Sequence, residues 1–306
     1  MGRLSRDKRD VYYRAAKEGG FRARSAFKLM QLDHTLDLLS GVRNVADLCA
    51  APGGWSQVLA LRLNGEASGS SGSFARIVAV DMYKMQPIEG VVQVQGDITH
   101  QETALAVLQH FCGERADLVV CDGAPDVTNM SDFDEYVQHQ LVLSEMQLAA
   151  ELLRPGGTFV AKVFRGEHIG ELYARLQALF GEVLCCKPRA SRNSSVEAFV
   201  VCRGFAAAPA GDGAQTRDIG TGAPVLRVKF VACGGEDDLD ADTNYPVDND
   251  HQVLAPLAPP IRAPYSEALE DRRGQKRPPT DAAERPPLGA GAAAAARAPG
   301  EGVGDV

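Results

Sequence analysis

The sequence predicts an α/β fold, in which a parallel sheet is covered by helices on both faces, followed by a tail of different character. Short apolar runs alternate with helical patterns over the first two thirds of the 306 residues. Such alternation favours a parallel sheet that is buried on both sides. Beyond Phe205 the sequence is rich in Gly, Ala and Pro and poor in aromatic residues, which is typical of a segment that builds no core of its own.

Seven apolar runs are predicted as strands. They cover residues 42–46, 75–80, 91–95, 117–121, 158–164, 182–186 and 198–202. Helical patterns occupy about residues 101–111, 134–153 and 168–180, and another helix begins near Ser56. Before the first strand, Ser25 suits the N-cap of a helix with Phe27 and Met30 on its apolar stripe. The run from Arg154 to Gly157 is expected to end the long helix.

The most informative turn follows the first predicted strand. The strand ends in Asp47, and the chain then turns through Pro52, Gly53 and Gly54 to Trp55, where a helix begins. Glycines at such a turn let the backbone approach a ligand closely. The spacing is neither the dinucleotide pattern G-x-G-x-x-G nor a phosphate-binding P-loop. It favours a nucleoside with a compact, non-phosphate group, such as S-adenosylmethionine, over an ordinary βα turn.

Acidic residues recur where predicted strands end. They are Asp47, Asp81, Asp97 and Asp122. A single aspartate could be a helix N-cap, but four at one edge of an open α/β sheet indicate a ligand site. Asp81 is placed to hold a ribose diol, and Asp97 an adenine amino group. We assign all four, with Pro52, Gly53, Gly54 and Trp55, as candidate cofactor-binding residues.

The net charge of −8 is unevenly distributed. Residues 1–30, which we call the basic arm, carry nine Lys or Arg and three Asp or Glu, a net of +6. Residues 205–306 carry ten and sixteen, a net of −6. Within the arm, Lys8, Arg9, Arg22 and Arg24 are interleaved with aromatic residues. This pattern suits contacts with an RNA backbone, although a merely solvated basic surface has the same composition.

We expect three regions: a folded domain with the basic arm (1–204), an extension with short ordered islands (205–265) and a disordered low-complexity tail (266–306). Residues 225–231 alternate like a strand, and residues 244–247 and 259–265 resemble extended linear motifs. Such islands dock either to their parent domain or to a partner, and we favour a partner.

The remaining composition limits localisation and metal binding. No signal peptide or transmembrane helix is predicted. Seven cysteines without a C-x-x-C pair indicate free thiols in a reducing compartment, so we expect the cytoplasm or the nucleus. The cysteines and six histidines show no metal-ligand spacing, and we predict no metal site.

Five segments occur in order along residues 1–204: SAFKL at 25–29, DLCAAPGGWSQ at 47–57, CDGAP at 121–125, VAKVF at 160–164 and SRNSSVEAF at 191–199. Together they resemble the FtsJ/RrmJ family of S-adenosylmethionine-dependent RNA ribose 2′-O-methyltransferases. The resemblance implies a Rossmann-like class I methyltransferase fold with a seven-stranded, mostly parallel sheet, and S-adenosylhomocysteine as product. Residues 7–13 and the tail islands look most similar to the eukaryotic branch that methylates nucleotides 32 and 34 of the tRNA anticodon loop. Cys49 replaces a family glycine.

The resemblance also implies a catalytic tetrad of Lys28, Asp122, Lys162 and Glu197, with Lys162 as general base, and an RNA contact from Arg192. A ribose hydroxyl is a poor nucleophile that must be oriented and deprotonated. A lysine with its ordinary pKa near 10.4 is protonated at neutral pH. We therefore expect repulsion from Lys28, together with burial, to lower the pKa of Lys162 by more than Asp122 and Glu197 raise it.

Other functions remain open at this point. The enzyme could act on rRNA or on a messenger cap, as other branches of the family do. A catalytically inactive RNA-binding scaffold conflicts with the intact tetrad, and a small-molecule methyltransferase leaves the basic arm unexplained. The tRNA branch further implies two partners, a WD-repeat protein for the wobble nucleotide and a large helical-repeat protein for nucleotide 32, with the extension as their docking segment.

Overall fold

The computed structural model describes residues 10–65, 74–125, 131–206 and 228–243, together with 245–246, 254–255 and 257–258. Two compact units divide the chain, residues 1–261 and residues 262–306, and the second lies outside the described residues. The expectation of a disordered tail over 266–306 therefore falls on residues that are not described, as do Lys8 and Arg9. No helix among the described residues is long and apolar enough to cross a membrane.

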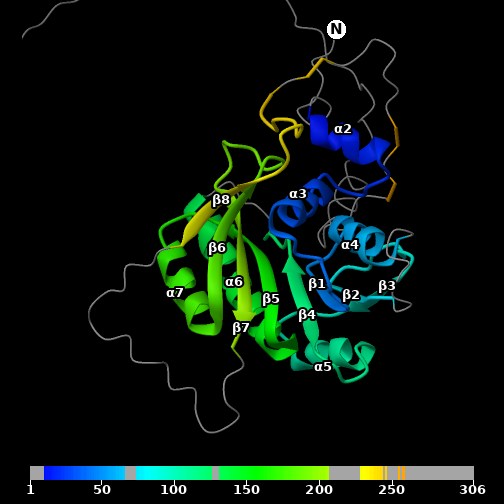
Figure 1. Ribbon diagram of the computed structural model, residues 1–306, viewed down its shortest axis with the longest axis vertical. Coiled ribbons are helices and arrows are strands. Elements are labelled where there is room, and N and C mark those ends of the chain that lie inside the picture. The colour runs from blue at the N-terminus through cyan, green and yellow to red at the C-terminus, as the bar shows by residue number, and fades with distance from the viewer. Residues whose placement is uncertain are drawn as a thin grey trace, which may run out of the picture. The chain divides into compact units, whose positions relative to one another are not determined.

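One sheet organises the first unit, and the strands described in it follow the order β3-β2-β1-β4-β5-β7-β6-β8 (Figure 1). The strands are β1 Asn44–Leu48, β2 Arg76–Asp81, β3 Val91–Gln95, β4 Ala116–Cys121, β5 Leu153–Phe164, β6 Phe180–Pro188, β7 Glu197–Phe205 and β8 Lys229–Cys233. The five neighbouring strands β3, β2, β1, β4 and β5 are parallel to one another. The strand β7 runs antiparallel between β5 and β6, and β8 is parallel to β6.

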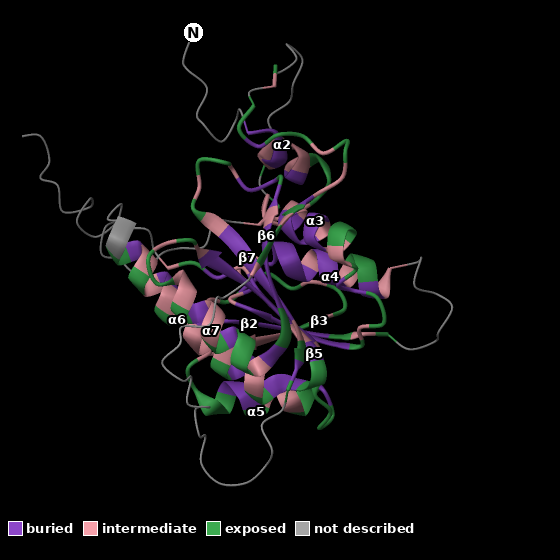
Figure 2. Ribbon diagram, turned by 60° about the vertical axis from the view of Figure 1, so that its left-hand side comes forward, coloured by how far each residue is buried: buried purple, intermediate pink, exposed green. Residues whose placement is uncertain are grey.

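Helices cover both faces of this sheet, as the sequence predicts. They are α2 Val11–Glu18, α3 Ala26–Leu36, α4 Gly54–Asn64, α5 Gln101–His110, α6 Ser131–Leu152 and α7 Ile169–Leu179. One core cluster joins apolar residues of α5, α6 and α7 to the sheet, and a second joins α3 and α4 to the opposite face. Figure 2 shows the strands buried between the two layers, while the outer faces of the helices are exposed. The sheet edge formed by the carboxyl ends of β1, β2 and β4 is thereby held rigidly from both sides.

The predicted elements are confirmed with small shifts at their ends. The main difference is β5, which begins at Leu153 rather than 158, because the Arg154–Gly157 segment continues into the strand with a register irregularity opposite β4. Gly156 accommodates this with φ of +78°, a backbone conformation that favours glycine. The helix α2 was not predicted, since it is short and its charged residues obscure the apolar pattern. Its N-terminus is fixed by Asp10, whose Oδ1 accepts a hydrogen bond from the Tyr13 N–H.

The extension contributes an eighth strand to the sheet. Of the predicted run 225–231, residues 225–227 are not described, and the observed strand β8 pairs with β6. The chain beyond β8 then lies beside α2 (Figure 1), where the Tyr12 hydroxyl donates a hydrogen bond of 2.6 Å to the Leu239 carbonyl. Ala241 is buried against Val11, Tyr12 and Ala190 in a small third cluster. This island thus docks to the parent domain, and a boundary at residue 204 cuts through the folded unit.

We expect truncation after residue 206 to destabilise the domain, whereas truncation after residue 261 leaves its stability unchanged. The shorter chain loses β8 and the packing of Cys233 and Ala241, which are 1% and 7% exposed. A loss of about 2 kcal/mol corresponds to a fall in Tm of roughly 4–8 °C for a domain of this size. Thermal unfolding of both truncations by circular dichroism tests this. Equal Tm values for the two would show that the extension is not part of the folded unit.

Candidate active site

Four ionisable side chains from four elements meet at the carboxyl edge of the sheet. Lys28 lies on α3, Asp122 follows the last residue of β4, Lys162 lies on β5, and Glu197 begins β7. Because β7 is antiparallel, its first residue lies opposite Phe164 at the end of β5. The topology therefore brings the start of β7 to the edge where β4 ends. The predicted tetrad is assembled in the structure.

The tetrad forms one buried ion-pair network. The Lys28 Nζ lies 2.8 Å from Glu197 Oε2 and 3.7 Å from Asp122 Oδ1. The Lys162 Nζ lies 3.3 Å from Asp122 Oδ1 and donates a 2.8 Å hydrogen bond to the Asp122 carbonyl. All four side chains are at most 15% exposed. Burying such charges is costly unless they are paired, and here each lysine faces a carboxylate.

Polar side chains outside the tetrad hold it in place. The Gln138 amide donates hydrogen bonds to the carbonyls of Gly123 and Lys162, at 3.3 and 2.9 Å, and so bridges β4 and β5 behind the site. The Ser191 hydroxyl donates to Glu197 Oε1. The Lys187 Nζ donates to the carbonyls of Ser195 and Glu197. Sequence reasoning missed Gln138 and Lys187, because each is recognisable only by the carbonyls that it reaches across the sheet.

Neighbouring charges explain the pKa values of Lys162 and Glu197. Burial lowers the pKa of Lys162, but Asp122 and then Glu197 outweigh it, and the net pKa is raised above the ordinary value. The expectation of a lowered pKa in the free protein is therefore wrong. The carboxylates of Asp122 and Glu197 affect the pKa of Lys162 more strongly than the positive charge of Lys28 does. Lys28 is itself paired with Glu197. Burial alone would raise the pKa of Glu197, but Lys28 and the Ser191 hydroxyl hold it at about 2.

The glycine turn forms a tight loop beside the tetrad. Gly53 has φ of +107°, and a Cβ there would lie 2.7 Å from the Ile88 side chain. A Cβ on Gly54 would lie 3.2 Å from that of Ala23. The carboxylate of Asp81 accepts hydrogen bonds of 2.8 Å from the N–H groups of Ala51 and Tyr83, which fixes the loop to the end of β2. The two glycines are therefore required because Ile88, Arg22 and Ala23 pack closely against the turn.

The other predicted cofactor residues have different environments. The Asp97 Oδ1 accepts hydrogen bonds from the N–H and hydroxyl of Thr99, which lower the pKa of Asp97. Asp47 is 1% exposed, and its carboxylate accepts a hydrogen bond from the Ser56 hydroxyl. Burial raises the pKa of Asp47 to about 7. Its side chain therefore holds the first turn of α4 through Ser56 and is buried in the interior.

Trp55, another predicted cofactor residue, has its side chain in the core. Its side chain is 2% exposed and packs against Phe199, with ring centroids 5.6 Å apart. Its indole N–H donates a 2.8 Å hydrogen bond to the Ser25 carbonyl. Trp55 therefore connects α4 to the start of α3, which carries Lys28. A motif position next to glycines indicated a ligand contact, but the large apolar ring is buried in the core.

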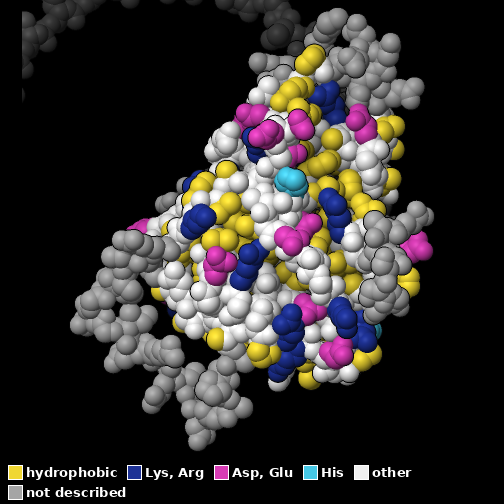
Figure 3. Space-filling view, in the orientation of Figure 1, with side chains coloured by type: hydrophobic (Ala, Val, Ile, Leu, Met, Phe, Trp, Pro, Cys, Tyr) yellow, Lys and Arg dark blue, Asp and Glu magenta, His cyan; other side chains and the backbone are white. Residues whose placement is uncertain are grey.

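The arginines predicted to bind RNA contact protein groups in this structure. The Arg22 guanidinium donates hydrogen bonds to the carbonyls of Pro52, Gln86 and Pro87, across the glycine turn. Arg24 and Arg192 both form ion pairs with Asp10, whose side chain is 3% exposed. Charge counting could not reveal these partners, because they are distant in the sequence. Figure 3 shows Lys and Arg interspersed with Asp and Glu on the visible face, with no single basic patch.

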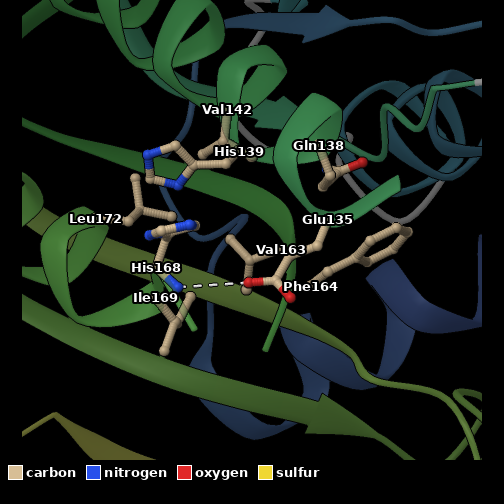
Figure 4. Close-up of a pocket in the computed structure, with 9 residues that line it drawn as sticks. All are labelled: Glu135, Gln138, His139, Val142, Val163, Phe164, His168, Ile169 and Leu172. Carbon is tan, nitrogen blue, oxygen red and sulfur yellow. Dashed lines mark hydrogen bonds between the residues drawn. The ribbon is translucent and has the colours of Figure 1, made fainter. Parts of the chain in front are cut away.

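A separate small pocket lies between α6 and α7. It is lined by Glu135, Gln138, His139, Val142, Val163, Phe164, His168, Ile169 and Leu172 (Figure 4). The imidazole rings of His139 and His168 have centroids 6.1 Å apart. The backbone N–H of His168 donates a 3.4 Å hydrogen bond to Glu135 Oε1. Since none of the tetrad residues or the glycine turn lines it, this pocket is not the predicted cofactor site.

The fold and this arrangement of residues define a class of protein. A glycine turn after β1, acids at the ends of β2 and β4, and an antiparallel β7 beside β5 are the features of a class I methyltransferase. The chain belongs to the FtsJ-like methyltransferase family, whose sequence profile matches residues 21–205.

Individual relatives agree with this assignment. The tRNA (cytidine(32)/guanosine(34)-2'-O)-methyltransferase of Homo sapiens is 50% identical over 291 residues, which cover 90% of this chain and 87% of the human protein. The protein of the same name from Schizosaccharomyces pombe is 48% identical, over 88% of this chain and 97% of its own length. Among solved structures, a putative ribosomal RNA methyltransferase from Plasmodium falciparum matches with a TM-score of 0.54 and 24% identity. It covers 60% of this chain and 98% of its own, and supports the fold.

The raised pKa of Lys162 gives a pH prediction. Because the pKa lies above its ordinary value, Lys162 is protonated near neutral pH in the free protein. A step that needs its neutral amine gains about tenfold per pH unit. We expect kcat/KM for methyl transfer to rise with this slope from about pH 7 to about pH 9 without levelling off. Initial rates across this range measure it, with the far-UV spectrum as a control for folding. A plateau at about pH 8 would contradict the charge balance described above.

Proposed function

We propose that this protein transfers a methyl group to ribose 2′-hydroxyls of the tRNA anticodon loop, at nucleotides 32 and 34, with S-adenosylmethionine as donor. The buried network of Lys28, Asp122, Lys162 and Glu197 is the observation that carries the proposal. Two amines and two carboxylates at the edge of a cofactor-type loop suit activation of an alcohol. The choice of tRNA rests on the relatives that are about half identical over most of the chain.

The residues present fit S-adenosylmethionine. Gly53 and Gly54 allow the tight turn after β1, and Asp81 stands at the end of β2 where a ribose diol would bind. Asp122 Oδ1 is buried without a hydrogen-bond donor among the described residues, although both lysines lie within ion-pair distance. The carbonyl of Pro52 is already held by Arg22. When bound, the cofactor supplies an electrophilic methyl group on a positively charged sulfur.

The tetrad residues have separate roles in this proposal. Lys162 Nζ accepts the proton of the ribose hydroxyl, and the oxygen is then free to take the methyl group. Lys28 and Asp122 orient Lys162 and the hydroxyl, and Glu197 fixes Lys28 through the 2.8 Å ion pair. The positive cofactor and exclusion of water by RNA disfavour a charged Lys162 and lower its pKa in the complex. Positioning a hydroxyl next to a base contributes a large part of such rate enhancements.

An rRNA substrate is the second candidate, since the solved relative from Plasmodium falciparum carries that description. The tRNA relatives match more of this chain, 90% and 88% of it against 60%. We therefore favour tRNA and the cytoplasm as the place of action. A scaffold role without catalysis is opposed by the complete tetrad.

Methyl transfer from labelled S-adenosylmethionine to total tRNA tests the substrate and the base together. We expect label in anticodon-loop ribose with the wild-type protein, and a loss of about 10²–10⁴-fold in Lys162→Ala. Arg175→Ala is the matched control, because Arg175 is an exposed cation on α7 that pairs with Glu171. Labelled rRNA in place of tRNA would support the second candidate. Full activity of Lys162→Ala would remove Lys162 as the base.

We also propose that the extension binds the two family partners, a WD-repeat protein and a large helical-repeat protein. The arm and extension already lie together, since Arg14 and Lys17 donate hydrogen bonds to the carbonyls of Pro246 and Leu254. Leu254 and Leu257 are 43% and 57% exposed, and the Leu254 carbonyl is itself one of these contacts. Exposed leucines next to a folded arm suit protein binding more than RNA binding.

Substitution, not truncation, tests this surface, because truncation near residue 206 removes β8. We expect Leu254→Asp with Leu257→Asp to weaken partner binding at least about tenfold without changing Tm, since both side chains are exposed. Leu105→Asp on α5 is the matched control, because Leu105 is 53% exposed and distant in sequence from the extension. Titration calorimetry with each partner measures the effect. Unchanged affinity in the double variant would place the partners elsewhere.

A further inference from the structure

Three residues that are distant in the sequence meet at the carboxyl edge of the sheet. Cys49 follows β1, Cys121 is the last residue of β4, and Glu145 lies on α6. Their sulfur and carboxylate oxygen atoms all lie within 4.8 Å of one another. Cys121 and Glu145 are buried and Cys49 is half-buried. The tetrad mechanism uses none of the three side chains.

Glu145 is an ionisable residue on a buried, apolar helix face. Its neighbours on the buried face of α6 are Val142, Leu148, Ala149 and Leu152, which all pack in the larger core cluster. Glu145 itself is 0% exposed, and no N–H or O–H donor among the described residues reaches its carboxylate, whose nearest donor is the weak S–H group of Cys121. Burial raises the pKa of Glu145 to about 7, and the nearby Cys121 thiol only partly opposes this. A buried carboxyl whose only donor is a weak thiol favours a further ligand at this point.

Cys49 shows a second costly feature at the same place. Its φ is +53°, in the left-handed region that favours glycine. The next strand end contributes Gly123, where a Cβ would lie 2.7 Å from Glu145 Oε1, 3.1 Å from the Cys49 Cβ and 3.2 Å from the Cys121 sulfur. The absence of a side chain at Gly123 leaves the three candidate ligand atoms in direct reach of one another. Strained backbone and a weakly partnered buried carboxyl at one point favour a functional explanation over a packing one.

We propose that Cys49, Cys121 and Glu145 bind a thiophilic divalent cation of the Zn²⁺ class. Two thiolates and one carboxylate are common Zn²⁺ ligands, and three protein ligands leave one position of a tetrahedral site for water or another ligand. Zn–S bonds of about 2.3 Å place two sulfurs roughly 3.8 Å apart in a tetrahedron, which the 4.8 Å limit allows. The half-buried Cys49 gives the cation a route from solvent.

Binding is a proton-coupled exchange. The cation displaces one proton from each thiol and, where Glu145 is protonated, one from its carboxyl group, so that two or three protons are released. No oxidant or reductant takes part. Burial raises the pKa of Cys121 well above its ordinary value, so metal binding must supply the free energy that ionises this thiol. Because Gly123 follows Asp122, a bound cation would also contact the backbone that positions the tetrad.

Co²⁺ and Zn²⁺ titrations of the full-length protein, with a non-thiol reductant present, test the proposal without using methyl transfer. We expect one equivalent of Co²⁺ to give the near-ultraviolet absorption of Co²⁺–thiolate bonds and Zn²⁺ to displace it. Cys121→Ser and Glu145→Gln should each weaken binding at least about tenfold, because losing even an outer-shell partner of a metal site costs about 10–100-fold in affinity. Cys112→Ser is the matched control, because Cys112 is exposed and lies outside the cluster.

Thermal unfolding separates loss of binding from loss of folding. Zn²⁺ should raise the Tm of the wild-type and Cys112→Ser proteins, because a ligand that binds only the folded state stabilises it. Glu145→Gln should fold with a nearly unchanged Tm without metal, because the amide has almost the same shape and size as the carboxyl group, and Zn²⁺ should raise its Tm less. Absent thiolate absorption in the wild-type protein would overturn the proposal. Equal affinity in Glu145→Gln and wild type would also overturn it, because the metal would then be bound by other thiols.

Discussion

The buried ion-pair network is the constraint on which the rest of the structure depends. Four charged groups lie at most 15% exposed at the edge of the sheet. Removing any one leaves an opposite charge buried without compensation, which is strongly destabilising. The four groups come from α3, β4, β5 and β7, so the network also fixes the relative positions of these elements. Stability and chemistry therefore depend on the same contacts.

The network explains why so many other polar groups of the domain are committed to positioning. Gln138, Ser191 and Lys187 hold the strand ends and Glu197. Arg22 clamps the glycine turn, and Arg24 reaches Asp10. Much of the positive charge of the basic arm is thereby used inside the protein. A preorganised site needs this kind of support, because side chains that must move into place lose much of their catalytic advantage.

The extension is part of the folded unit, so the domain does not end at residue 204. Its strand β8 completes the sheet beside β6, and the segment beyond it covers α2. The acidic residues of this segment do more than balance the positive charge of the basic arm, because several of them make specific hydrogen bonds. Asp242 accepts a hydrogen bond from the Asn193 N–H, and Arg189 donates to the carbonyls of Glu236 and Asp238. The loop that carries Ser191 and Arg192 is thus held between the arm and the extension.

The sequence by itself determined the α/β class and the order of the strands and helices along the chain, whereas the tetrad residues were implied by the resemblance to the FtsJ/RrmJ family. Local periodicity sets the elements, and motif residues at strand ends must meet at one edge of a sheet. The tertiary structure decided what depends on partners distant in the sequence. It placed Trp55 and Asp47 in the interior, paired the arm arginines with Asp10 and with backbone carbonyls, and raised the pKa of Lys162. Burial and electrostatic balance are sums over neighbours in space, and a linear pattern does not contain those neighbours.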